Sequence, residues 1–240
     1  MKTKEMSVEE LLNAGKVPVY TDRHFVYTSD EHGEAYANLR SLAAEENLPI
    51  LRELSYRLIA HAIEAAKLDL SQQIVVVGPE TLGAMIAEEG VAIFNLRTLH
   101  GTPRLRAGNF IHDPADKKKF LWGEGGESAI IASGAQIIWI DDLLNQGSTL
   151  KRTRHLVEDF WPDSIKVVAT IVDRSHESAE SLEVPILVNL VKLSLQSYSA
   201  NQCPFCAEKR PMILHPGHGW KFQESNPDYI GGFYSLEAIP

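Results

Sequence analysis

Short apolar runs alternate along the chain with longer segments in which apolar residues recur every three or four positions. The short runs are typical of buried strands, and the longer spacing is typical of helices with one buried face. The expected strands are residues 74–77, 91–94, 137–140, 165–172 and 185–189. The expected helices are residues 7–12, about 35–67, about 81–89 and a segment from about 149 onward. This alternation predicts an α/β fold with a mostly parallel sheet flanked by helices.

Polar residues gather where three of these strands end. The turn Gly78–Gly83 follows the first strand, the acids Asp141 and Asp142 follow the third, and the pair Asp173 and Arg174 follows the fourth. Ligands of open parallel sheets bind beyond the carboxyl ends of the strands. The three groups are therefore expected to line one pocket.

The stretch after the paired acids has the chemistry of a phosphate site. A small polar turn leads to Ser148 and Thr149, where a helix is expected to begin. Backbone N–H groups at a helix N-terminus and the helix dipole hold a phosphate. The two hydroxyls add donors, and the acids can bind ligand hydroxyls or magnesium. The alternative interpretation is an ordinary strand-to-helix turn with an acidic strand end.

Composition narrows the class of protein further. The 240 residues carry a net charge of −9, and 44% of them are hydrophobic, which suits one α/β domain or a domain with a modest appendage. Lys117–Lys119 is the only basic block, so a nucleic-acid partner is disfavoured. The chain has no apolar run of about 18 residues and no apolar signal core at its start. We therefore expect a cytoplasmic protein without a membrane partner.

Residues 137–149 resemble the ribose-phosphate signature of type I phosphoribosyltransferases. In that signature an apolar strand, two acids and two apolar residues precede Thr-Thr-Gly-Gly-Thr. Gly147 and Thr149 match the glycine and the final threonine, while Asn145 and Gln146 replace the two leading threonines. The resemblance implies a type I phosphoribosyltransferase fold with a small N-terminal hood, a C-terminal tail and 5-phosphoribosyl diphosphate (PRPP) as a substrate.

Three further stretches, in the same order along the chain, resemble the orotate phosphoribosyltransferase branch. Residues 25–38 are similar to the opening hood segment, residues 78–87 to the turn that faces pyrophosphate, and residues 171–174 to the strand end whose arginine contacts the base. The tail from Cys203 resembles the C-terminal extension of a bacterial subgroup. The resemblance implies a domain over residues 1–198, with its hood in about 1–40 and a tail over 199–240.

The resemblance also assigns roles to individual residues. Asp141 and Asp142 bind the ribose hydroxyls and magnesium, and Arg174 contacts an anionic pyrimidine base such as orotate. Lys117–Lys119 balance the charge of the departing pyrophosphate. The substrate contacts are completed by Asn145, Gln146, Gly147, Ser148, Thr149, Glu80, Thr81 and Ser29. A homodimer is implied as well, because members of this branch lend each other the mobile loop.

Some positions depart from the family pattern. Thr28 and Asp30 replace the hood lysine and glycine, and Leu82 stands where many members have a basic residue. The catalytic loop aligns with residues 113–126, which have three lysines but no arginine or histidine. Arg104 and Arg106 are alternative sources of positive charge.

These departures leave three functions open. The first is an active orotate enzyme, and the second is a phosphoribosyltransferase for another base. The third is a regulatory protein that binds PRPP or a nucleotide without turnover. Two groups of residues could also have no role in the reaction. Arg174 could form a salt bridge to Asp173 or Glu177, and Lys117–Lys119 could lie in a solvated loop.

The tail carries a possible metal site. Cys203, Cys206, His215 and His218 supply four thiol and imidazole ligands within sixteen residues, and zinc takes four such ligands tetrahedrally. The alternative is two reduced thiols beside two surface histidines, because two cysteines do not make a disulfide framework.

Overall fold

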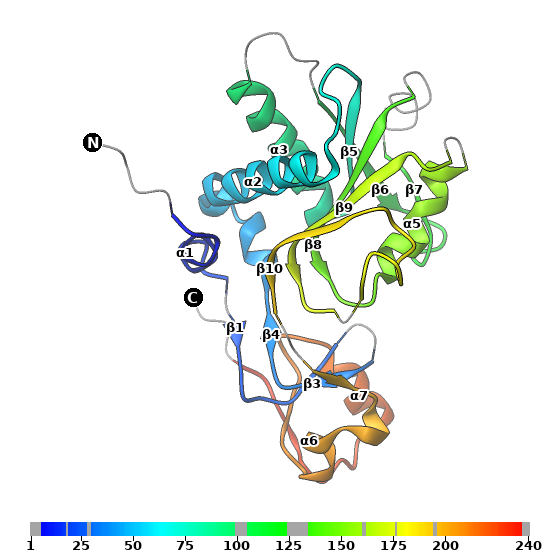
Figure 1. The fold of residues 1–240 in the computed structure, drawn as a ribbon. Helices are drawn as coiled ribbons and strands as arrows, with labels where there is room; N and C mark the ends of the chain where they lie inside the picture. Colours follow the sequence, from blue (N-terminus) through cyan, green and yellow to red (C-terminus); the bar gives the residue numbers. More distant parts are fainter. Residues whose placement is uncertain are drawn as a thin grey trace. The chain divides into compact units, whose positions relative to one another are not determined.

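The computed structural model describes residues 6–236, except 18, 28–29, 99–104, 124–133, 160–161, 176 and 194–195. The chain forms two compact units (Figure 1). The larger one, the sheet unit, comprises Met1–Gly15 and Leu42–Leu193, and the smaller one, the hood unit, comprises Lys16–Ser41 and Ser194–Pro240. The hood segment and the tail therefore belong to the same unit, although the whole sheet unit separates them in sequence.

The sheet unit contains one six-stranded sheet in the order β10-β9-β8-β5-β6-β7. Its strands are β5 (Ile74–Pro79), β6 (Arg106–His112), β7 (Phe120–Trp122), β8 (Gln136–Leu144), β9 (Ile165–Asp173) and β10 (Leu187–Lys192). Adjacent strands from β10 through β6 pair in parallel, and β7 pairs antiparallel with β6. The α/β fold with a mostly parallel sheet is confirmed.

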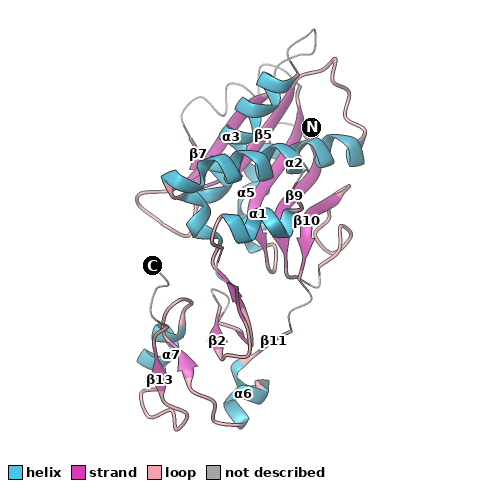
Figure 2. Cartoon of the chain, turned by 90° about the vertical axis from the view of Figure 1, so that its left-hand side faces the viewer, coloured by secondary structure: helices cyan, strands magenta, loops and turns pink. Residues whose placement is uncertain are grey.

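Helices cover both faces of this sheet (Figure 2). They are α1 (Val8–Ala14), α2 (Leu48–Ala66), α3 (Leu82–Arg97) and α5 (Ser148–Glu158). The helices α2 and α3 pack on each other and on one face, while α5 packs on the opposite face. On the α5 face Trp139 is buried and its Nε1 donates a hydrogen bond to Thr153 Oγ1 at 2.9 Å.

The first helix begins as its sequence predicts. The N–H of Glu10 donates to Ser7 Oγ at 3.1 Å, and the Glu10 carboxylate accepts from the N–H of Ser7 at 2.6 Å. These reciprocal bonds form a capping box and satisfy two backbone donors that a helix start would otherwise leave unpaired.

The prediction of a strand at residues 91–94 is wrong, because α3 continues through these residues to Arg97. Its buried residues Ile86, Gly90 and Phe94 recur every four positions, so they line one helical face toward the core. Gly90 lets α3 approach α2 closely: a Cβ there would lie 2.6 Å from Ile59 Cδ1. A short apolar run cannot distinguish a strand from a buried helix segment.

The helix expected over about 35–67 is only partly present. Tyr36–Ala37 is a strand, and two 3-10 turns, Leu39–Ala43 and Glu45–Asn47, precede α2. The strands β6 and β7 were not expected, because they lie in a stretch, residues 96–128, without a clear apolar pattern. Only alternate residues of β6 are deeply buried.

The hood unit is built from very short elements. Its strands are β1 (Val19–Tyr20), β2 (Phe25–Val26), β3 (His32–Gly33), β4 (Tyr36–Ala37), β11 (Ser197–Tyr198), β12 (Met212–Ile213) and β13 (Phe233–Tyr234). Its helical segments are a 3-10 turn (Ala200–Gln202), α6 (Pro204–Ala207) and α7 (Gly219–Ser225). A small cluster of Phe25, Tyr27 and Ile213 forms its apolar core.

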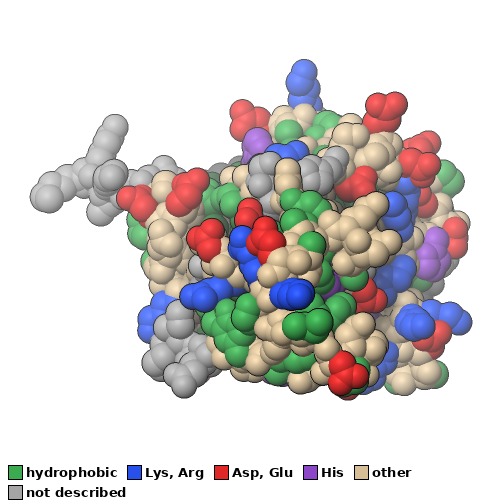
Figure 3. Space-filling view, turned by 90° about the horizontal axis from the view of Figure 1, so that it is seen from below, with side chains coloured by type: hydrophobic (Ala, Val, Ile, Leu, Met, Phe, Trp, Pro, Cys, Tyr) green, Lys and Arg blue, Asp and Glu red, His purple; other side chains and the backbone are tan. Residues whose placement is uncertain are grey.

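The surface carries charges of both signs. The face seen in Figure 3 has acidic and basic side chains interspersed, with hydrophobic side chains between them. Among the described residues, no helix combines the length and apolar character that crossing a membrane requires.

Candidate active site

The site is built where the strand order of the sheet reverses. After β5 the chain passes through α3 to β6 on one side, and β8 later pairs with the other side of β5. A crevice forms beyond the carboxyl ends of the strands at such a switch point, because the connections diverge there. The turn after β5 and the acids of β8 flank this point.

The two acids lie inside β8, which continues to Leu144, rather than after its end. Asp141 is buried, and its Oδ1 accepts the backbone N–H of Asp142 at 2.9 Å. Burial raises the pKa of Asp141 well above its usual value, and the neighbouring Asp142 carboxylate raises it further. A buried carboxylate whose pKa is raised by burial and by an adjacent carboxylate is typical of functional sites.

The turn after β5 contacts this acid directly. A Cβ on Gly83, the second residue of α3, would lie 3.0 Å from Asp141 Oδ1 and 2.7 Å from Pro79 Cδ, so the start of this helix and the carboxylate pack closely. Gly78 has even less room, because a Cβ there would lie 2.1 Å from the carbonyl oxygen of Gly83. Two of the three groups that were expected to line one pocket are therefore neighbours at this edge of the sheet.

Backbone contacts fasten the same turn to β6. The N–H of Glu80 donates to Phe110 O at 2.7 Å, and the Glu80 carboxylate accepts the N–H of His112 at 2.9 Å. Thr81 immediately precedes α3, and Leu82, its first residue, is buried. The position that is often basic in the family therefore holds a core side chain here.

The expected phosphate cradle, Asn145–Thr149, directly follows β8. Gly147 adopts φ +64°, and a Cβ there would lie 2.4 Å from Leu182 Cδ2, so both conformation and space favour glycine. The helix α5 begins at Ser148, and the N-cap glycine has no side chain to satisfy its first N–H groups. Ser148 is exposed and Thr149 half-buried at this helix start. Of the other cradle residues, Asn145 is half-buried and Gln146 is exposed.

Arg174 is tied to the end of β8. Its backbone N–H donates to Leu144 O at 3.0 Å, and its side chain is buried. The neighbouring Asp173 accepts the N–H and the hydroxyl of Ser175 at 2.7 and 2.6 Å, and Lys192 Nζ lies 3.5 Å from its other oxygen. The arginine thus lies at the same sheet edge as the paired acids.

The three lysines form the exposed turn between β6 and β7. Because this turn follows the carboxyl end of β6, it lies at the edge of the sheet that carries the acids. Arg152 of α5 donates from Nη1 to Lys118 O at 3.4 Å, which links the turn to the cradle helix. Arg106, by contrast, starts β6 and lies at the opposite edge of the sheet.

Some sequence expectations lie outside the described residues. Ser29 and Thr28 of the hood segment, Arg104, and the end of the expected catalytic loop from residue 124 onward belong to this group. Nothing in the fold tests them.

The cysteines meet different histidines from those expected. Cys203 and Cys206 lie with His24 and His32, and His215 and His218 are not part of this group among the described residues. Burial lowers the pKa of His24 and lowers that of His32 to about 4. Burial and the adjacent Cys203 raise the pKa of Cys206 to about 12. Sequence analysis missed the two hood histidines as partners, although both stand in the hood-like segment.

The fold and the site together define a class: an α/β sheet with paired acids at its switch point and a glycine turn that opens onto a helix N-terminus. The profile of the family described as phosphoribosyl transferase domain matches residues 49–200. The chain belongs to this family and is an enzyme of the transferase class.

Curated relatives and solved structures agree with the family. The orotate phosphoribosyltransferase of Caldanaerobacter subterraneus is 26% identical over 198 residues, covering 82% of this chain and 90% of the relative. That of Carboxydothermus hydrogenoformans is 26% identical over 199 residues, covering 81% and 88%.

Two solved structures share the fold. The structure of the Aeropyrum pernix orotate phosphoribosyltransferase has a TM-score of 0.51 at 19% identity, covering 78% of this chain and 94% of that one. The Francisella tularensis enzyme has a TM-score of 0.52 at 11% identity, covering 80% and 85%.

Proposed function

We propose that this chain transfers the 5-phosphoribosyl group of PRPP to orotate, with magnesium and with release of pyrophosphate. One observation carries the proposal: Asp141 packs against the start of α3, just after β5, and lies six residues before Gly147 and the start of α5. A ribose held by the acids would have its phosphate at the helix start and its pyrophosphate near the turn. A homodimer, implied by the resemblance, is part of the same proposal.

The acids suit a magnesium ion. The carboxylate of Asp141 is buried beside Asp142, and burial, with the adjacent carboxylate, raises its pKa and so disfavours its ionised form. A divalent cation with oxygen ligands would favour the ionised form of both acids. Bound there, magnesium would neutralise part of the charge on the pyrophosphate leaving group.

In the proposed reaction a nitrogen of orotate bonds to C1 of PRPP while the bond from C1 to the pyrophosphate oxygen breaks, and the proton on that nitrogen passes to the departing pyrophosphate. Negative charge grows on pyrophosphate as it leaves, so donors and cations at the turn after β5 stabilise the transition state. Leu82 adds no charge there, and the lysines at the end of β6 are the cations we assign to this role. The hydroxyls of the ribose stay on Asp141 and Asp142 throughout.

Orotate is favoured over other bases by two observations. The curated relatives reported above are orotate phosphoribosyltransferases. The guanidinium of Arg174 is buried at the edge of the sheet that carries the acids, where it can form paired hydrogen bonds to an anionic pyrimidine.

The direct test is pyrophosphate release from PRPP and magnesium with a panel of purine and pyrimidine bases. Release with orotate, lowered by about 10²-fold or more in Arg174→Ala, is the expected result. Release with another base alone would assign a different acceptor. Binding of PRPP without release for any base would identify a regulatory protein.

The lysine turn provides a second prediction. Simultaneous replacement of Lys117, Lys118 and Lys119 by alanine should lower kcat by about 10²–10³-fold, because charge-assisted contacts to the leaving group are lost. Arg106→Ala is the matched control: this cation lies at the opposite edge of the sheet, and its removal should leave kcat unchanged. Equal rates in the triple variant and the wild type would show that these lysines belong to a solvated turn.

A further inference from the structure

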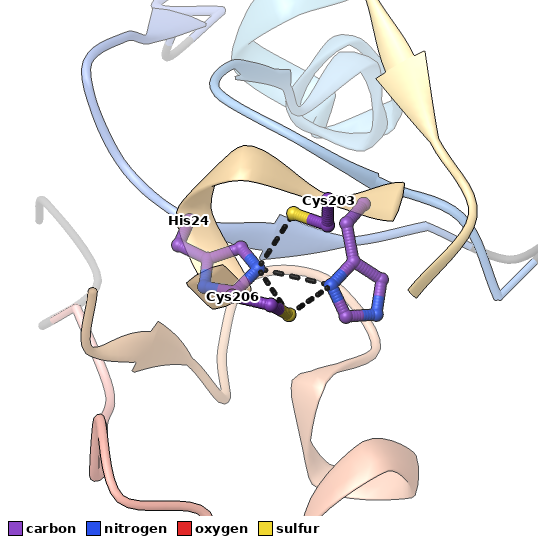
Figure 4. A group of neighbouring side chains, drawn as sticks. His24, Cys203 and Cys206 are labelled. Carbon is purple, nitrogen blue, oxygen red and sulfur yellow. Dashed lines mark hydrogen bonds between the residues drawn. The ribbon is translucent and has the colours of Figure 1, made fainter. Parts of the chain in front are cut away.

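Four side chains that can ligate a metal ion come from distant parts of the sequence and lie together inside the hood unit. His24 follows the first strand of the unit and forms a bridge to Met212, while His32 lies in β3. Cys203 precedes α6, and Cys206 lies within it. Figure 4 shows the side chains of His24, Cys203 and Cys206 pointing toward one another. The four ligand atoms all lie within 4.8 Å of one another.

The separations lie near the edges of a zinc tetrahedron: two agree with them, and the two that involve His32 are about 0.4 Å shorter. Zinc–sulfur bonds of about 2.3 Å and zinc–nitrogen bonds of about 2.0–2.1 Å give S···N edges of about 3.6 Å and N···N edges of about 3.3 Å. The observed S···N distances are 3.6 Å for Cys203 to His24, 3.7 Å for Cys206 to His24 and 3.2 Å for Cys206 to His32. The two imidazole nitrogens, His24 Nε2 and His32 Nδ1, lie 2.9 Å apart.

The surroundings orient one of these ligands. His24 Nδ1 faces the carbonyl oxygen of Arg210 at 3.2 Å, which favours a proton on Nδ1 and leaves the lone pair of Nε2 directed into the cluster. Tyr229 donates to the same carbonyl at 2.8 Å and so helps to fix it. A histidine that ligates metal through one nitrogen commonly donates from the other to such a carbonyl.

Three of the four ligands are also closed to solvent. His24, His32 and Cys203 are buried, with exposed fractions of 1%, 0% and 3%, and Cys206 is half-buried. Closed Cys2His2 sites of this kind are structural, because no position remains open for a substrate. Both cysteines are unpaired as thiols, so they remain available as ligands.

The hood unit needs such a support. It has about 70 residues in two segments, its strands are two residues long, and its apolar cluster is small. A unit of this size rarely gains enough stability from its core alone, and a structural metal is one of the usual additions. We propose that His24, His32, Cys203 and Cys206 bind one zinc ion that joins the hood segment to the tail.

The first experiment measures the zinc content of the purified full-length protein by inductively coupled plasma mass spectrometry. One zinc per chain is expected for the wild type, and a loss of at least about tenfold in occupancy for His24→Ala and Cys206→Ser. The matched control is the double variant His215→Ala, His218→Ala, which should keep its zinc. Loss of zinc in the control and retention in His24→Ala would overturn the ligand assignment.

A second measurement does not depend on a variant that folds. Wild-type protein is stripped of metal with a chelator under reducing conditions and titrated with Co2+. Thiolate-to-cobalt charge-transfer bands and tetrahedral d–d bands that saturate at one Co2+ per chain, and vanish on addition of zinc, are the expected result. The absence of these bands, or a Cys203–Cys206 disulfide in protein purified without reductant, would overturn the proposal.

Discussion

Replacement of Asp141 by asparagine should lower pyrophosphate release by about 10²–10³-fold and at the same time raise the melting temperature. The activity falls because a neutral amide cannot balance magnesium or accept ribose hydroxyls as a carboxylate does. The stability rises because the buried carboxylate, beside Asp142, is costly to ionise in the folded chain. Each kcal/mol gained would shift the midpoint by about 2–4 °C for a chain of this size.

The pH dependence follows from the direction of the pKa shift. The pKa of Asp141 is raised in the folded state, so the folded chain holds this proton more tightly than the unfolded chain does. The wild type therefore loses stability as the pH rises above the unfolded value, whereas the asparagine variant does not. The difference in melting temperature should be small near about pH 4 and larger near about pH 7, as thermal scans at both values would measure.

Asp163→Asn is the control for this substitution. Asp163 is exposed and lies in the turn before β9, at the amino end of that strand, so neither rate nor melting temperature should change. A lower melting temperature for Asp141→Asn than for the wild type would mean that the carboxylate stabilises the fold and would contradict the prediction.

Gly147→Ala should abolish most of the activity, by about 10²-fold or more in kcat/KM for PRPP. The added methyl would lie 2.4 Å from Leu182 Cδ2 in a packed environment, and the φ of +64° is strained for any side chain, so we expect the turn to shift. A shift of about 1 Å in a group that positions a substrate can cost about this factor. Steady-state kinetics with varied PRPP measures the effect.

Gly232→Ala is the control for this variant. It separates the effect of the steric clash from the loss of stability that any side chain causes at a left-handed backbone position. Gly232 also has a positive φ, +73°, but a Cβ there meets nothing within 4 Å. Both variants should lose roughly 1–2 kcal/mol of stability from the left-handed conformation, and only Gly147→Ala should lose activity. Equal activity of the two variants would show that the turn tolerates the methyl group.

The sequence predicted the parts of the site that lie close together along the chain. The stretch from Asp141 to Thr149 carries the acids, the turn and the helix start in one continuous segment, and their order alone indicates the chemistry. The same holds for the Gly78–Gly83 turn. The sheet could be predicted for β5, β8 and β9, because their apolar runs are long and end in charged or glycine-rich segments.

Contacts between segments that are distant in the sequence could not be predicted from local sequence patterns. Cys206 lies 174 residues from His32 and 182 from His24, whereas His215 and His218 are close in sequence and offer the same ligand atoms. Spacing along the chain favours the nearer pair, whereas the pairing of β3 with β11 and the bridge of His24 to Met212 draw the hood histidines to the tail. The strand β6 was not predicted for a related reason. It is buried by the neighbouring strands and helices, and its own composition has no clear apolar run.

The division of the hood unit between two ends of the chain sets an order of assembly during synthesis. Domains generally fold as units while the chain emerges, beginning from the N-terminus. All the residues of the sheet unit leave the ribosome before the segment Ser194–Pro240 does, so the sheet can form while Lys16–Ser41 still lacks its partners. A nascent chain that stopped before Cys203 would carry a complete sheet and only half of a hood.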